Sequence, residues 1–253
     1  MLGYIDYLFY RAIGILKPSK KRQAWENEVR RRYATKVGMK KRRDNSGHAV
    51  LSYEHDGKFD YELYREIQTL GNKGKIDRVS VQQSNIEYLC RELEKHVSPI
   101  DFVLCHGTRN AAEQKFFAAA LPQAKTILGT EISDTADQFP MTIQWDFHEV
   151  KPEWRGAVDV VFSNSFDHSY DPDKLFTAWL SCLRVNGIMA LEWCKAHNVT
   201  GPQILDPYKV SLPGLIELLR KYCADGAFRL LDPLEQAPGK TNGETYLLVQ
   251  RVR

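Results

Sequence analysis

The stretch that decides the fold runs from Asp101 to Glu131 and reads DFVLCHGTRNAAEQKFFAAALPQAKTILGTE. An apolar run, residues 101–105, breaks at Gly107 into a tight turn, and a helical segment and a second apolar run ending in Glu131 follow. A strand, a turn, a helix and a strand that ends in a carboxylate is the order with which doubly wound sheets bind a nucleoside. The glycine lets the backbone approach a ligand, the helix N-terminus offers free N–H groups, and the acid can accept both ribose hydroxyls. This segment is the first indication of an adenosine cofactor.

Strands and helices are expected to alternate through the rest of the chain. The expected strands are 101–105, 126–131, 141–144, 158–162, 188–192, 228–231 and 245–249, and the expected helices are 111–120, 173–183 and 212–222. This alternation predicts an α/β fold, a doubly wound and mostly parallel sheet with helices on both faces.

The chain before residue 98 is expected to be more irregular. Residues 45–58 read as a loop or weak hairpin, and residues 61–70 have helical spacing that Gly71-Asn72-Lys73-Gly74 interrupts. Residues 80–83 have the form of a capping box for a helix that runs toward Pro99. We therefore divide the chain into an appendage at 1–43, a helical lead-in at 44–97 and the main domain at 98–253.

The composition is that of an ordinary soluble protein. The 253 residues can bury a sizeable core, and 43% of them are hydrophobic and 26% charged. The five cysteines form no C-x-x-C pair, and no stretch reads as a secretory leader. We therefore expect reduced thiols and a cytoplasmic protein.

The N-terminal appendage is apolar at first and then strongly basic. Met1–Leu16 is too short to span a bilayer, and Pro18 ends it. Residues 11–43 hold thirteen Lys and Arg against two Glu, a net charge of +11, which leaves −8 on the remainder of the chain. Such a segment can lie on an anionic membrane surface, bind nucleic acid, or form a helix around residues 24–34 whose apolar face packs on the main domain.

Residues just after the strands are the candidates for function, because ligands of such sheets bind beyond the carboxyl ends of the strands. One of these groups lies within residues 158–172, VDVVFSNSFDHSYDP. It resembles the segment D-h-V-h-s-x-x-h-L-E-H-x-x-D-P (h hydrophobic, s small) of the ubiquinone-biosynthesis type of class I S-adenosylmethionine-dependent methyltransferases. Residues 183–187 continue like that family's turn into its fifth strand. The resemblance covers about residues 98–195, with a tail to 253.

The resemblance implies a seven-stranded, Rossmann-like methyltransferase sheet, methyltransferase activity and the cofactor S-adenosylmethionine. It also implies which residues bind each part of the cofactor. Glu131 would bind the ribose, Asp146 the adenine amino group, and Ile132 or Phe147 the ring face. Asn164 and Ser165 would border the methyl group.

The turn that would pass beneath the methionine part consists of Cys105, His106, Gly107, Thr108 and Arg109. The family turn is commonly G-x-G-x-G, and of its three glycine positions only Gly107 keeps the glycine. Arg109 would bind the methionine carboxylate through two hydrogen bonds, or it would crowd the pocket of a fold that has lost its cofactor.

His168, with Asp167 beside it, is the expected catalytic residue. Histidine can accept a proton near neutral pH, and this one would lie beside the methyl donor; the alternative is a structural histidine that holds the loop. His148 and Glu149 follow Asp146 on a loop, but their spacing matches no known metal geometry, so we expect no metal.

The residues that would bind the cofactor do not identify the methyl acceptor. The protein must only align and desolvate the acceptor and remove a proton from it. The fourth strand does not end in the N-P-P-Y type of sequence associated with methylation of exocyclic amines of bases and of glutamine. We expect O-methylation of a small molecule, a sugar or a lipid-linked glycan, the last because the N-terminus could hold the chain peripherally at a membrane. The alternatives are an RNA methyltransferase that grips phosphates with its basic segment and a non-catalytic binding protein.

Overall fold

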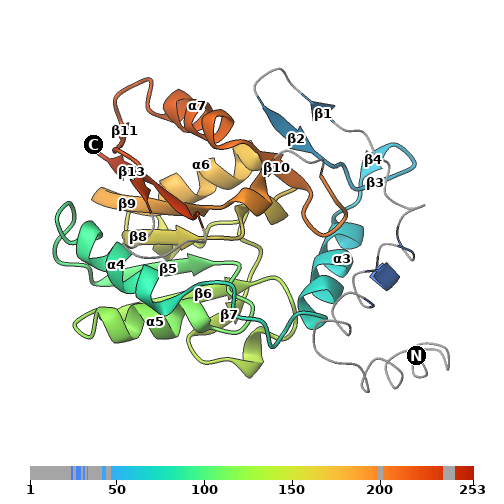
Figure 1. Ribbon diagram of the computed structural model, residues 1–253, viewed down its shortest axis with the longest axis horizontal. Helices are drawn as coiled ribbons and strands as arrows, with labels where there is room; N and C mark the ends of the chain where they lie inside the picture. The colour runs from blue at the N-terminus through green and yellow to red at the C-terminus, as the bar shows by residue number, and fades with distance from the viewer. Residues whose placement is uncertain are drawn as a thin grey trace.

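The computed structural model describes residues 47–198, 202–235 and 243–253, together with residues 24, 27–29, 31, 33, 42 and 43 of the N-terminal segment. Its centre is a sheet with the strand order β11-β13-β9-β8-β5-β6-β7, and β12 pairs with β13 (Figure 1). The strands are β5 (Phe102–His106), β6 (Thr126–Glu131), β7 (Thr142–Gln144), β8 (Val158–Ser163), β9 (Leu183–Trp193), β11 (Phe228–Leu230), β12 (Leu234–Glu235) and β13 (Thr245–Arg251). Strands β5 to β9 are parallel, and β13 is antiparallel to its neighbours. The predicted doubly wound, mostly parallel α/β sheet is confirmed, with the two-residue β12 as an addition.

Helices cover both faces of this sheet (Figure 1). Helices α4 (Gln83–Leu93) and α5 (Ala112–Ala120) pack on one face, and α6 (Pro172–Cys182) and α7 (Leu212–Tyr222) on the other. The last two begin where the sequence supplies a cap and a proline: Asp171 accepts from Lys174 N, and Ser211 from Gly214 N. The two apolar layers fix the sheet between them, so its strand ends are held rigidly.

The central strands are buried on both sides, which is why they read as continuous apolar runs. Asp159 is the charged residue of β8, and it is nevertheless buried, with only 3% of its surface exposed. Its carboxylate accepts the backbone N–H groups of Asp101 and Phe102 and pairs with Arg184. This buried acid therefore anchors the start of β5 to β8 and β9.

Helices α3 (Tyr61–Lys73) and α4 each differ from an expectation about the lead-in. Helix α3 is not interrupted at Gly71, because that glycine packs against Leu205, whose Cδ2 would lie 2.5 Å from an added Cβ. The predicted capping box is also wrong: α4 begins at Gln83, and its N-cap residue Gln82 makes no side-chain cap bond. Local sequence signals are weaker here than the tertiary contacts.

Short strands tie the lead-in to the main domain. β2 (His48–Val50) pairs with β1 (Arg42–Arg43) and with β10 (Tyr208–Val210), and β3 (Glu54–His55) and β4 (Lys58–Phe59) form the expected weak hairpin.

The described residues of the 24–33 stretch are helical. Val29 and Tyr33 are buried against Leu51, Tyr64 and Ile67, and the Tyr33 hydroxyl donates to Glu66. This part of the appendage therefore packs on the rest of the protein, in line with the third alternative given above. Met1–Leu16 lies outside the described residues. Among the residues described, no helix has the length and apolar character needed to cross a membrane.

Candidate active site

The candidate site lies at the carboxyl end of β5, where the strand order reverses between β6 on one side and β8 on the other. The turn after β5 needs its glycine. Gly107 has a φ of +74°, and an added Cβ would stand 2.7 Å from the Ser165 Cβ. Arg109 and Ala111 also adopt positive φ. The glycine therefore lets the turn adopt a positive φ and approach the Ser165 side chain closely.

A pocket opens above this turn, and we call it the inner pocket. It is bounded by the turn, by the ends of β6 and β8 and by helix α3, and its lining includes Tyr64, Gln68, Asn72, Gly107, Arg109, Glu131, Ile132, Trp145, Phe147, Ser165 and His168. Glu131 is 6% exposed and accepts the N–H groups of Arg109 and Ser133 at 3.1 and 2.9 Å. Burial raises the pKa of the Glu131 carboxyl. The end of β6 thus presents to the pocket a carboxylate that two backbone N–H groups fix in place.

Asp146 lies beside the inner pocket rather than in it. Its Oδ1 accepts from the backbone N–H of His148 and lies 2.8 Å from His148 Nδ1. Although burial alone would raise the pKa of Asp146, His148 lowers it. The other oxygen, Oδ2, is buried and has no hydrogen-bond partner within the described residues. Asp146 borders a shallow hollow next to Trp145, so it can still reach the edge of a ligand there.

Three of the expected turn residues keep their side chains out of the pocket. Cys105, His106 and Thr108 are all less than 3% exposed. The His106 ring stacks on Trp179 with centroids 4.9 Å apart, and burial lowers the pKa of His106 to about 3. Only the backbone of these positions can meet a ligand.

Arg109 turns its guanidinium toward the segment between α3 and α4. Nε donates to Asn72 Oδ1 at 3.1 Å, and Nη1 to Arg78 O and Ser80 Oγ. Asn110 donates to the carbonyls of Ile76 and Arg78. Arg109, at the last glycine position of the family turn, and Asn110 after it therefore bind residues 72–80 to the turn.

A second, more polar hollow continues from the inner pocket over the ends of β8 and β9, and we call it the polar cleft. Its lining includes Glu113, Asn164, Asp167, Glu192, His197, Asp206 and Lys209. Lys75, Gly107, Arg109, Ser165 and His168 border both spaces. These five residues mark the passage between them.

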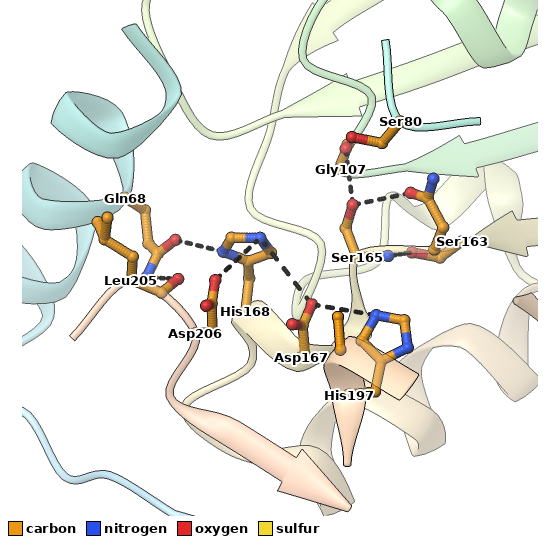
Figure 2. Close-up of polar contacts among 12 residues, drawn as sticks. Gln68, Ser80, Gly107, Ser163, Ser165, Asp167, His168, His197, Leu205 and Asp206 are labelled. Atoms are coloured by element: carbon orange, nitrogen blue, oxygen red, sulfur yellow. Dashed lines mark hydrogen bonds and ion pairs between the residues drawn. The ribbon is translucent and has the colours of Figure 1, made fainter. Parts of the chain in front are cut away.

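His168 lines both spaces, and Figure 2 shows its ring between Gln68 and the carboxylates of Asp167 and Asp206. Its Nδ1 lies 2.8 Å from the Gln68 amide oxygen, which can only accept, so Nδ1 carries the proton and Nε2 keeps a lone pair in the neutral ring. Nε2 lies 3.9 Å from a carboxylate oxygen of Asp167 and of Asp206. Burial lowers the pKa of His168, although the two carboxylates oppose this. The lowered pKa favours the neutral form of the ring.

Asp167 belongs to a buried ionic network behind His168. Lys209 Nζ donates to Asp167 Oδ2 at 3.3 Å and to the Ala196 carbonyl at 3.0 Å, and His197 Nε2 lies 3.8 Å from Asp167 Oδ1. Burial alone would raise the pKa of Asp167, but His197, His168 and Lys209 lower it. Sequence reasoning missed Gln68 and Lys209. Gln68 could have been noticed as an amide on the apolar face of α3, whereas a lysine in a three-residue strand gives no signal.

No protein-family model and no curated protein sequence matches the chain. Solved structures do resemble it. The 1,6-didemethyltoxoflavin-N1-methyltransferase of Burkholderia thailandensis, with 1,6-didemethyltoxoflavin and S-adenosylhomocysteine bound, has a TM-score of 0.54 at 15% identity, covering 84% of this chain and 99% of its own. The plantazolicin methyltransferase BpumL, in complex with a triazolic desmethylPZN analog and S-adenosylhomocysteine, has a TM-score of 0.57 at 13% identity, covering 72% and 90%.

At these identities the likeness concerns the fold. The narrower ubiquinone-biosynthesis type stays a prediction. The strand order, the parallel centre and the solved neighbours agree, and the chain therefore has the fold of the class I S-adenosylmethionine-dependent methyltransferases.

Proposed function

We propose that the chain is an S-adenosylmethionine-dependent methyltransferase. The observation that carries the proposal is the inner pocket at the switch point, which Gly107 lines without a side chain and to which Glu131 presents a buried carboxylate. Ligands of doubly wound sheets bind at this point. The two solved neighbours bind S-adenosylhomocysteine, the demethylated cofactor, on the same fold.

The residues present fit this cofactor. Glu131 would accept the ribose hydroxyls, and the Asp146 carboxylate, which borders the hollow beside Trp145, would accept from the adenine amino group. Phe147 and Ile132 supply apolar surface for the purine. The methionine part would cross Gly107 into the polar cleft beside Asn164 and Ser165, which border that space. When bound, S-adenosylmethionine supplies an electrophilic methyl group.

The acceptor would lie in the polar cleft, and we propose that it offers a hydroxyl group. His168 borders both spaces and is held in the tautomer whose Nε2 can accept a proton. Asp167 and Asp206 would stabilise the ring once it is protonated. A small polar molecule, a sugar or a lipid-linked glycan suits a cleft lined by charged side chains.

Calorimetry with S-adenosylhomocysteine tests the proposed function. The wild-type chain should bind, and Glu131→Ala should weaken binding by roughly 1–3 kcal/mol, the free energy of a lost hydrogen-bonded charge. Glu153→Ala, which removes an exposed glutamate remote from the pocket, should bind like the wild type. No binding by the wild type, or equal binding by Glu131→Ala, contradicts the proposal.

We also propose that the basic appendage meets an anionic membrane surface. Each cationic side chain near such a surface contributes about 1 kcal/mol. Anionic liposomes should retain the chain at low salt, and replacing Lys20, Lys21 and Arg22 by Gln should release it while leaving the buried Val29 and Tyr33 in place. Stronger retention by RNA than by liposomes would favour the RNA alternative.

A further inference from the structure

Glu113 is a buried carboxylate that the proposed methyl transfer does not use. It lies in the first turn of α5, lines the polar cleft and is 6% exposed. Its Oε2 atom has no hydrogen-bond partner in the part of the chain that the structure describes. A buried charged oxygen without a partner is unfavourable by about 1–3 kcal/mol or more, so this atom calls for a ligand.

Two of the cations that line the polar cleft are engaged with other groups. Lys209 donates to Asp167 and to the Ala196 carbonyl and lies 3.7 Å from Asp206. Arg109, which lies close enough to lower the pKa of Glu113, donates its guanidinium hydrogen bonds to residues 72–80. Neither residue donates to Glu113 Oε2, and the Asn164 side chain, which also lowers the pKa of Glu113, carries no positive charge.

Glu192 makes this wall of the cleft more acidic. It lies near the end of β9, is 6% exposed and accepts the Tyr246 hydroxyl at 2.8 Å. The pKa values of Glu113 and Glu192 are both raised to about 7, chiefly by burial, and the charge of Glu192 contributes to the rise at Glu113. Two buried carboxylates that repel one another favour a cation close to them.

A primary ammonium group matches these observations better than a metal ion. It carries one charge and three N–H donors, which suit a single free carboxylate oxygen. Mg²⁺ and Ca²⁺ need six or more oxygen ligands, and no three side chains of metal-binding type converge among the described residues.

We propose that Glu113, with Glu192 near it, binds a primary ammonium group in the polar cleft. The inference rests on the proposed function, because two amines could then reach this wall. One is the α-amino group of the cofactor's methionine part, and the other is an amino group on the acceptor, as in an amino sugar. Both have the same chemistry, and experiment can separate them.

The first arm measures cofactor binding by calorimetry. The ligands are S-adenosylhomocysteine, its analogue without the α-amino group, and 5′-methylthioadenosine, which lacks the whole amino-acid part. If the ammonium is the cofactor's, the wild type binds S-adenosylhomocysteine about 10- to 100-fold more tightly than the deamino analogue. Glu113→Gln should lose this preference and keep its affinity for the other two ligands. Glu153→Gln, an exposed glutamate remote from the cleft, is the matched control.

The second arm measures binding of n-propylammonium and of n-propanol to the protein saturated with S-adenosylhomocysteine, by ligand-observed NMR. If the ammonium is the acceptor's, the wild type binds the amine and not the alcohol, and Glu113→Gln binds neither. The wild-type comparisons in both arms need no variant, so misfolding of Glu113→Gln cannot hide the answer.

The inference is overturned if the wild type prefers neither amine over its neutral partner, or if Glu113→Gln keeps the preference. Failure of the proposed function looks different. In that case the wild type binds neither S-adenosylhomocysteine nor 5′-methylthioadenosine, and the second arm, run on the free protein, still tests the ammonium subsite.

Discussion

The inner pocket and the polar cleft share the residues at their passage, yet they are built in different ways. The floor of the inner pocket is the backbone turn at Gly107, beside Glu131, which two neighbouring N–H groups hold. The polar cleft is lined by side chains from six separate segments, and within it Lys209 pairs with Asp167 and Asp206. The first arrangement suits a ligand shared across a fold, and the second suits one that differs between its members.

The largest expected effect breaks the ionic network of the cleft. Lys209 is 4% exposed, so Lys209→Met should leave Asp167 buried without its main cation and lower the free energy of unfolding by about 3–5 kcal/mol. Chemical denaturation measures this loss. Adding Asp167→Asn to the variant should restore part of it. A loss below about 1 kcal/mol would mean that the network is not what holds this side of the site together.

The next effect separates the two regions in function. His168→Asn should lower turnover about 100-fold and change the affinity for S-adenosylhomocysteine by less than about threefold, because the ring serves the acceptor and not the nucleoside. His96→Asn, an exposed histidine remote from the cleft, is the control for turnover assays. Unfolding of the variant, or normal turnover, would return His168 to a structural role.

Arg109 lines both the inner pocket and the polar cleft, so its variants test how the two spaces differ. The guanidinium straps residues 72–80 over the turn, so Arg109→Ala should speed hydrogen exchange in that segment. Because Arg109 would also contact the methionine carboxylate, which adenosine lacks, affinity for S-adenosylhomocysteine should fall about tenfold, or about 1.4 kcal/mol, while affinity for adenosine changes little. If Arg109→Gly instead created affinity that the wild type lacks, the arginine would be an obstruction and the site a degenerate one.

The smallest effect concerns pH. The folded-state pKa of Glu113, about 7, exceeds the ordinary value of 4.5, so the folded state binds more protons between these values. The contribution of Glu113 to the free energy of unfolding is therefore fully present below pH 4.5 and is lost as the pH rises through 7. The groups that act on Glu113 are Arg109, Glu192 and Asn164. Between pH 5 and 7, the free energy of unfolding of the wild type should fall by at least about 1 kcal/mol more than that of Glu113→Gln. Equal slopes would place the Glu113 pKa near its ordinary value.

The same contrast explains what could be predicted from the sequence. The turn at Gly107 and the acid at Glu131 follow local rules of strand, turn and helix, and β6 and α7 begin and end where the pattern predicted. The cleft depends on contacts between residues far apart in the chain, such as Gln68 with His168 and Lys209 with Asp167. No local sequence pattern predicts pairs of residues so far apart in the chain. The continuation of α3 past Gly71 was missed for the same reason, because Leu205 supplies the contact.

A crystal structure of the chain with S-adenosylhomocysteine tests the central claim most directly. The account predicts the ribose on the Glu131 carboxylate, the purine against Phe147 and Ile132, and the sulfur at the passage between Ser165 and His168. A purine bound in the polar cleft, or a ligand that leaves Glu131 untouched, would contradict it.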